Sequence, residues 1–167
     1  GVGHTNGKCD ILLFSDADLN LSYRLQQLTS MKVDPEGKLL RITNPELFNH
    51  PFIYMVEPGR LEFSDEEVKT LRRYLHSGGF LMVDDFWGDW EWNNFYDNIK
   101  RVFPDREPIE LPIEHEIFHC VYDLKEKAQV PSIHAWMSGR TDEGRPDAQE
   151  AHYRGIFDDK GRMMVII

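Results

Sequence analysis

Residues 78–88 read Gly-Gly-Phe-Leu-Met-Val-Asp-Asp-Phe-Trp-Gly, and this stretch decides the fold. A pair of glycines precedes a continuous apolar run, which ends abruptly in two carboxylates and a tryptophan. Continuous apolar runs are typical of strands that are buried on both faces of a parallel sheet. Open α/β folds place their ligand sites at the carboxyl ends of such strands. We therefore expect a strand over residues 80–84 that delivers Asp84, Asp85 and Trp87 to a candidate site.

The residues before this stretch predict a helix that leads directly into the strand. Ser64 and Glu67 have the spacing of a capping box, which marks a helix start. Val68, Leu71 and Leu75 follow at helical spacing, and the glycine pair is typical of a helix end. This helix-glycine-strand unit is the clearest local signal in the chain.

The rest of the chain alternates between strand and helix patterns. Further strands are expected at residues 10–14, 38–43, 52–56, 107–111, 152–157 and 162–167, and further helices at residues 18–31 and 90–103. Residues 113–124 are compatible with a short helix, and residues 131–151 read as an irregular loop or lid. Such alternation predicts a three-layer α/β sandwich with a largely parallel sheet, formed by residues 1–167 as one domain. Because residues 163–167 end the chain on an apolar strand, we expect a further C-terminal segment.

Composition and charge exclude several classes of protein. The 167 residues are 41% hydrophobic and 29% charged, which are globular values, and the formal net charge is −10. No basic cluster supplies the electrostatic footprint of a nucleic-acid binder. No apolar run approaches the length of a membrane span, so direct membrane insertion by this segment is not expected. Cys9 and Cys120 are too few and too far apart for a disulfide framework or a zinc ribbon.

Acidic residues follow several of the expected strands. Crossover connections bring the carboxyl ends of parallel strands to one edge, where we expect Asp18, Glu57, Asp84 and Asp85. Carboxylates gathered there could bind a hard cation or a cationic group, or share a proton, and Trp87 could stack on a ligand. The alternative is that one aspartate only caps the next helix and the tryptophans belong to the core.

His115, Glu116 and His119 match the H-E-x-x-H pattern of zinc peptidases. That chemistry needs both histidines on one helical face, a glutamate base and a third ligand. The pattern begins only three residues after Pro112, and no extended zinc motif follows it. We therefore rank a zinc peptidase below the other hypotheses and expect no metal at the site. The chain also lacks the G-x-S-x-G, P-loop and dinucleotide-binding patterns, so no bound cofactor is expected.

Several motifs together resemble an uncharacterised bacterial family that is known only as a domain of unknown function. They are Asp-Leu-Asn at 18–20, Phe-Ile-Tyr at 52–54, the stretch 78–88, Pro-Asp-Arg at 104–106, Ile-Phe-His at 117–119, Tyr-Asp-Leu at 122–124 and Gly-Arg-Met-Met-Val at 161–165. The family is similar in fold to class I glutamine amidotransferases, which have a flavodoxin-like architecture. The resemblance implies that the domain continues beyond Ile167 in other members, some of which are exported or tethered to membranes.

The amidotransferase likeness can be tested at two positions. In those enzymes a Pro-Gly-Gly after one strand supplies oxyanion donors, and the next strand ends in an elbow that carries the catalytic cysteine. Here residues 57–59 read Glu-Pro-Gly, and residues 84–88 contain no cysteine. Without that nucleophile no thioester can form, so glutaminase activity is not expected.

The leading hypothesis is a non-catalytic module that binds a small molecule or a protein partner in an acidic, aromatic pocket. Its candidate ligand-binding residues are Asp18, Glu57, Asp84, Asp85, Trp87 and His119. The alternative is a hydrolase that uses Asp84 or Asp85, with or without a metal. The sequence leaves the ligand, the compartment and the oligomeric state open.

Overall fold

The computed structural model describes residues 16–34 and 37–167, with side chains from residue 19 onward. The α-helices are α1 (Asp16–Leu28), α2 (Asp65–His76), α3 (Gly88–Val102) and α4 (Ile133–Met137). The strands are β1 (Phe52–Val56), β2 (Phe80–Asp84), β3 (Ile109–Glu110), β4 (Arg154–Phe157) and β5 (Met163–Ile166). Short 3-10 helices are η1 (Pro45–Asn49), η2 (Pro58–Arg60) and η3 (Glu116–Phe118). The strand expected at residues 10–14 lies outside the described residues.

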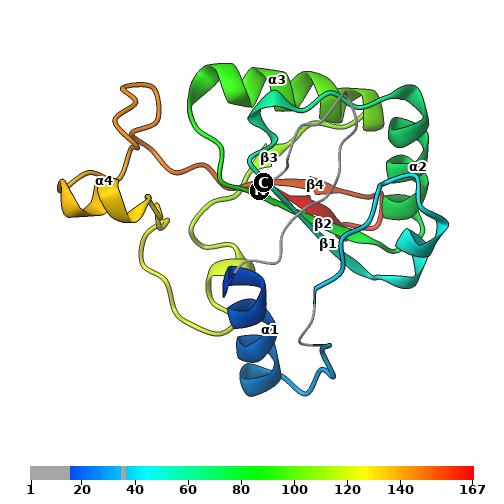
Figure 1. The fold of residues 1–167 in the computed structure, drawn as a ribbon, viewed down its shortest axis with the longest axis horizontal. Coiled ribbons are helices and arrows are strands. Elements are labelled where there is room, and N and C mark those ends of the chain that lie inside the picture. The colour runs from blue at the N-terminus through cyan, green and yellow to red at the C-terminus, as the bar shows by residue number, and fades with distance from the viewer. Residues whose placement is uncertain (1–15, 35–36) are drawn as a thin grey trace.

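The strands form one sheet in the order β1-β2-β5-β4-β3 (Figure 1). β1 pairs with β2, and β2 with β5, in parallel, whereas β4 is antiparallel to both β5 and β3. β4 is therefore the one strand of this sheet that runs against the other four. This arrangement confirms a mixed α/β fold with a mostly parallel sheet, and it places β5 in the middle of that sheet.

The crossover from β1 through α2 to β2 positions the site. The predicted capping box is present: the Ser64 hydroxyl accepts from the Glu67 N–H, and the Glu67 carboxylate accepts from the Ser64 N–H. At the other end of α2, the Gly79 N–H donates to the Tyr74 carbonyl at 3.1 Å, and β2 starts at once. The parallel register runs from Phe52 opposite Phe80 to Val56 opposite Asp84. Both strands therefore end at the same edge.

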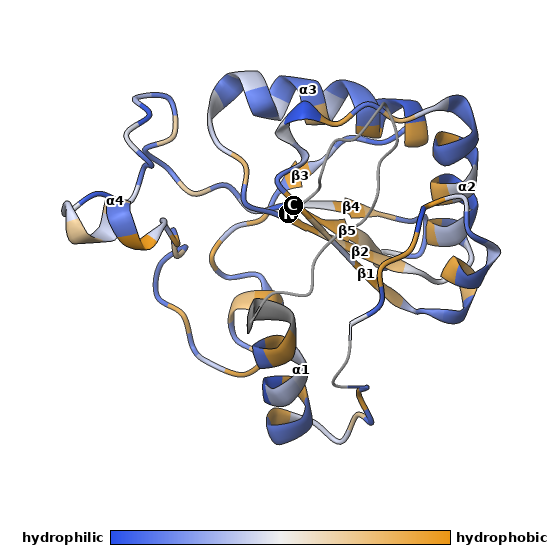
Figure 2. Ribbon diagram, viewed as in Figure 1, coloured by the Kyte–Doolittle hydropathy of each residue, from blue (hydrophilic) through white to orange (hydrophobic). Residues whose placement is uncertain are grey.

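Helices α2 and α3 cover one face of the sheet, as Figure 1 shows. Their inward residues Leu71, Leu75, Phe95 and Ile99 belong to a buried cluster with side chains of β1, β2 and β5. Figure 2 shows the corresponding division, with apolar residues concentrated along the strands and polar residues on the outer sides of both helices. Burial of this apolar surface is the main source of stability for the fold.

The opposite face is covered differently from the three-layer prediction. Leu111, Phe118 and Ile166 form a second buried cluster, to which η3 and the residues around it contribute. No long helix contributes to that cluster among the residues the structure describes. α1 lies apart from α2 and α3 in Figure 1, and its Tyr23 and Leu28 remain exposed.

Three local predictions were wrong or incomplete. Residues 38–43 form no continuous strand: Arg41 makes an isolated β-bridge, and the chain then turns at Ile42 and enters η1, which Asn44 caps. Ile42 is nevertheless completely buried, so its apolar character reports burial and not a strand. In 113–124 only the three residues of η3 are helical, and within 131–151 the chain forms the short helix α4. No helix in the described ranges is long and apolar enough to cross a membrane.

Candidate functional site

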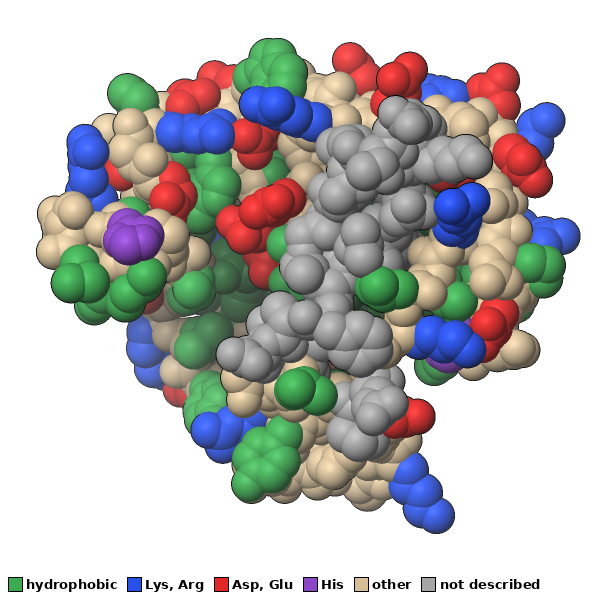
Figure 3. Space-filling model, in the orientation of Figure 1, with side chains coloured by type: hydrophobic (Ala, Val, Ile, Leu, Met, Phe, Trp, Pro, Cys, Tyr) green, Lys and Arg blue, Asp and Glu red, His purple; other side chains and the backbone are tan. Residues whose placement is uncertain are grey.

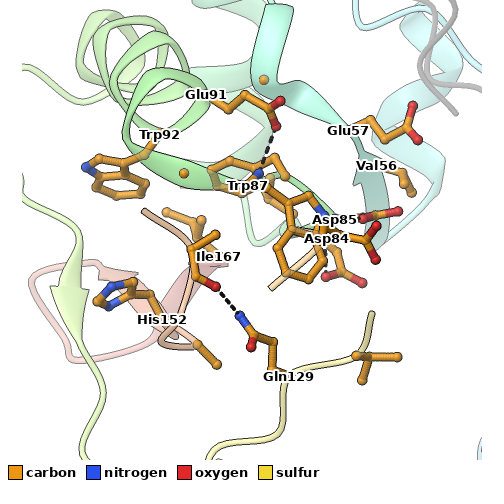
Figure 4. A pocket seen from close by; sticks show the side chains of 18 of the residues that line it. Val56, Glu57, Asp84, Asp85, Trp87, Glu91, Trp92, Gln129, His152 and Ile167 are labelled. Atoms are coloured by element: carbon orange, nitrogen blue, oxygen red, sulfur yellow. Dashed lines mark hydrogen bonds between the residues drawn. The ribbon is translucent and has the colours of Figure 1, made fainter. Parts of the chain in front are cut away.

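A hollow of about 1150 Å³ lies at the carboxyl ends of β1 and β2. Figure 3 shows acidic side chains beside this hollow, and Figure 4 shows Asp84, Asp85 and Trp87 next to one another inside it. Among the described residues, eight carboxylates line it: Glu57, Asp84, Asp85, Asp89, Glu91, Glu143, Asp147 and Glu150. Three arginines also line it: Arg60, Arg145 and Arg154. The hollow therefore has an excess of negative charge.

Asp84 ends β2 and is held in place by two donors. The Tyr54 hydroxyl, from β1, donates to Asp84 Oδ2 at 3.0 Å. The Asp85 N–H donates to Asp84 Oδ1 at 2.8 Å. Within the described part of the chain, each carboxylate oxygen thus has one partner and keeps lone pairs for another, because an ionised carboxylate accepts about four hydrogen bonds.

An acidic residue with a left-handed backbone directly follows each of the two strands. Glu57 follows β1 with a φ of 52°, and Asp85 follows β2 with a φ of 59°. Residues other than glycine, asparagine and aspartate seldom adopt this backbone conformation, because their Cβ approaches the following carbonyl. The Trp87 indole N–H donates to Asp85 Oδ1 at 2.9 Å, which fixes the carboxylate against the ring. No hydrogen bond or ion pair joins the Glu57 carboxylate to another described residue, and this side chain is exposed.

Glu91 connects three parts of the site. Its Oε2 accepts from the Trp87 N–H at 2.8 Å, and its Oε1 pairs with Arg145 Nη2 at 2.8 Å. It also lies directly over Gly59, where an added Cβ would stand 2.5 Å from Glu91 Cγ. Only glycine at position 59 allows η2 and α3 to approach this closely.

The start of α3 is capped from a distant segment. Trp87, the N-cap residue, makes no side-chain cap, but Asp147 Oδ2 accepts from the Asp89 N–H at 2.9 Å. Arg145 Nη1 donates to the Trp87 carbonyl at 2.7 Å. Residues 85–88, called the elbow loop below, are therefore fastened to residues 145–147. Gly88 makes this contact possible, since a Cβ there would lie 2.4 Å from Asp147 Oδ2.

The other side of the hollow contains a cluster of opposite charges. Glu110 pairs with Arg154 at 3.2 Å and His152 at 3.2 Å, and it also contacts Lys127. Burial raises the pKa of Glu110, but hydrogen bonds from Lys127 and from the Tyr153 N–H outweigh it, so the pKa lies below the ordinary value. The Arg154 guanidinium stands 3.9 Å from the centre of the Trp92 ring. Burial lowers the pKa of Arg154, and the charge of Glu110 opposes that shift.

Four of the six candidate residues lie together. Glu57, Asp84, Asp85 and Trp87 all line the hollow, as their positions after the strands predict. His119 does not line it. Asp18 lies in α1, and its side chain is outside the described part of the chain.

His119 has both ring nitrogens engaged elsewhere. Its Nδ1 lies 2.6 Å from Asp123 Oδ1, and its Nε2 lies 2.8 Å from the Ile113 carbonyl oxygen. Residues 115 and 119 flank a single 3-10 turn, so they lack the α-helical spacing that places two zinc ligands on one face. Among the described residues, no group of three or more acidic, histidine or cysteine side chains is arranged to hold a metal ion.

Sequence reasoning missed the contribution of Glu91, Arg145 and Asp147. Glu91 carries a weak signal, because it stands in the first turn of a predicted helix beside the elbow loop. Arg145 and Asp147 lie in an irregular stretch, where no periodicity indicates which side chains return to the sheet edge. Contacts between residues 58 positions apart depend on the tertiary fold and have no local pattern.

Comparison with curated proteins finds none that matches this chain. A family model described as a domain of unknown function, DUF4159, matches residues 3–167. That range includes every element that builds the site. The chain therefore belongs to the DUF4159 family.

Proposed function

We propose that this domain is a non-catalytic binding module whose ligand carries a positively charged group. The observation that supports this proposal is the pair of acidic residues, Glu57 and Asp85, that follow adjacent parallel strands in left-handed conformations beside Asp84. Guanidinium and ammonium groups form strong charge-assisted hydrogen bonds with carboxylates. The Trp87 ring adds a surface on which a cation can stack.

The chemistry of the elbow loop supports binding over catalysis. In the likeness to class I amidotransferases, Glu57-Pro58-Gly59 stands where oxyanion donors belong, and residues 84–88 stand where the nucleophile belongs. Residues 84–88 contain no thiol or hydroxyl group that could attack a carbonyl. We propose the same flavodoxin-like ancestry for this fold, because β1, α2 and β2 have the required parallel connection.

A ligand pair of similar shape and different charge tests the proposal. Arginine amide should raise the melting temperature of the protein in a concentration-dependent way, because a ligand of the native state stabilises it. Nα-acetylcitrulline amide carries no positive charge, because its urea group and its acetylated amine are both neutral, and it should have little effect. Equal shifts with the two compounds, or none with either, would contradict a cationic ligand.

Matched variants locate the binding. Asp85→Asn and Asp84→Asn should each weaken binding of arginine amide about ten- to a hundredfold, since losing one charged hydrogen bond costs about 1.5–3 kcal/mol. Asp97→Asn removes a charge from the exposed side of α3, outside the hollow, and should bind as the wild type does. If all three variants lost affinity equally, the loss would reflect the overall charge of the protein and would not locate binding in the hollow.

One observation favours a second candidate, a hydrolase that uses Asp85. Residues held at positive φ are found at active sites, where strain orients a reacting group. Turnover of a generic ester, phosphate or peptide substrate that is abolished by Asp85→Asn, with or without a divalent metal, would establish this function instead. We also propose, from the family resemblance alone, that the domain serves an exported or membrane-linked assembly. Cell fractionation with an antibody against the domain would decide that point, and purely cytosolic recovery would refute it.

A further inference from the structure

The long segment between Phe118 and Ala148 is held to the body by polar contacts. Phe118 and Ala148 are buried, whereas none of residues 119–147 is. Its helix α4 leaves Ile133, Trp136 and Met137 exposed, and Figure 1 shows α4 projecting from the rest of the molecule. Segments without buried apolar contacts open locally at low free energy, while the core stays folded.

Part of this segment is closed on itself. Gln129 Nε2 donates to the Ala148 carbonyl at 2.8 Å, which joins the two ends of residues 129–148. The Ser132 hydroxyl, at the start of α4, donates to Glu143 Oε2 at 3.0 Å. Loops whose ends meet and whose side chains contact one another behave as compact units. We call residues 129–148 the flap.

Two residues near the end of the flap fasten it to the elbow loop and α3. Arg145 donates to the Trp87 carbonyl at 2.7 Å and pairs with Glu91 at 2.8 Å, and Asp147 accepts from the Asp89 N–H at 2.9 Å. Arg145 and Asp147 are both exposed. The Glu91 side chain is only 16% exposed, but the Arg145 side chain is 44% exposed and Asp147 is exposed as well, so water and salt can compete for these contacts and the attachment is reversible.

We propose that the flap is a gate over the hollow, latched by Arg145 and Asp147. Flap residues Val130, Pro131 and Ser132 line the hollow, so displacement of the flap widens it. Opening also releases the Glu91 carboxylate, which then becomes available to the cationic group of a ligand. This inference rests on the proposed function only in treating the hollow as the binding site.

Hydrogen exchange measured by mass spectrometry, without any ligand, tests the latch. In Arg145→Met combined with Asp147→Ala, the amides of the flap should exchange about three- to tenfold faster, while those of β2 keep the wild-type rate. Asp147→Asn retains an oxygen that can accept from the Asp89 N–H, so this single variant should exchange nearly as the wild type does. Arg140→Met removes a flap cation whose nearest carboxylate, Asp142 at 4.0 Å, belongs to the flap itself, and should change nothing.

Varying the ionic strength provides an independent test of the latch that needs no variant. Raising ionic strength should accelerate exchange in the wild-type flap relative to β2, because screening weakens the Arg145–Glu91 pair. Unchanged flap exchange in the double variant, or an increase that β2 shares, would overturn the gate. Opening as expected without binding of arginine amide would refute the proposed function alone, whereas binding with an unchanged flap would refute the gate alone.

Discussion

Glu57 has a backbone conformation that suits glycine better than glutamate. A left-handed residue with a side chain costs about 1–2 kcal/mol, and the extra flexibility of glycine in the unfolded chain offsets about 0.5–1 kcal/mol of that. Because the Glu57 side chain is exposed and has no partner in the described residues, no interaction of this side chain offsets the conformational cost. Such a residue is expected where function requires the side chain.

Replacing Glu57 with glycine should therefore separate stability from binding. We expect Glu57→Gly to raise the free energy of unfolding by about 0.5–1 kcal/mol and to weaken binding of arginine amide. Urea denaturation measures the first effect. Glu62→Gly is the matched control: Glu62 is exposed and is not among the described residues with positive φ, so the same change there should destabilise. A destabilised Glu57→Gly protein would show that the glutamate is structural.

The close approach of Gly59 and Glu91 gives a prediction of the opposite sign. Gly59→Ala should lower the free energy of unfolding by about 1–3 kcal/mol, because the new methyl group overlaps Glu91 Cβ and Cγ. Shortening Glu91 to alanine in the same protein removes Cγ and should relieve part of that loss. A double-mutant cycle by urea denaturation measures the coupling, and strictly additive effects would contradict the steric explanation.

At the level of elements, Glu110 joins β3 to β4 and to Lys127, which precedes the flap. Its folded-state pKa lies below the ordinary value of 4.5, so its contribution to stability is fully present above pH 4.5 and is lost as pH falls through the lowered pKa. Glu110→Gln does not titrate. The difference in stability between wild type and this variant should therefore be largest near neutral pH and shrink below pH 4.5.

Thermal unfolding between pH 3 and pH 7 measures this difference. Glu126→Gln changes an exposed carboxylate for which no ion pair occurs among the described residues, and it should follow the wild type throughout. A constant difference between Glu110→Gln and wild type across this range would show that the contacts of Glu110 do not depend on its charge.

Elements with a strong local signal were predictable from the sequence. The capping box at Ser64 and the apolar run at 80–84 report local chemistry, and the helix-to-strand unit they predict is present. Because parallel strands share an edge, the same reasoning placed Glu57 beside Asp85. The prediction of a strand over residues 38–43 failed because an apolar residue such as Ile42 is buried equally well in a turn.

Long-range contacts were not predictable from local patterns. The second face of the sheet is covered by Phe118 and its neighbours, and η3 is too short to show helical periodicity. Asp147 caps α3 across 58 residues, and no spacing rule relates the two. Only part of the candidate site can therefore be predicted from the sequence. The strand ends can be identified, whereas the contacts that fasten the flap to them depend on tertiary structure.

At the scale of the whole molecule, both the negative charge and the rigid strands would favour binding of a cationic ligand. The net charge is −10, and the hollow has eight carboxylates for three arginines among its described lining. Such a field raises the association rate of a cationic ligand and makes its binding sensitive to salt. Carboxylates at the end of rigid strands are also held in place in advance, which would reduce the entropy lost on binding the proposed cationic ligand.

The position of β5 has a consequence for how this protein is made. β5 pairs with β2 on one side and β4 on the other, although it follows both of them along the sequence. A ribosome that has not yet released residues 163–166 therefore carries a nascent chain in which β1 and β2 present an unpaired edge. Unpaired edges invite association with other chains, so this stage of translation is the one at which a chaperone would protect the protein.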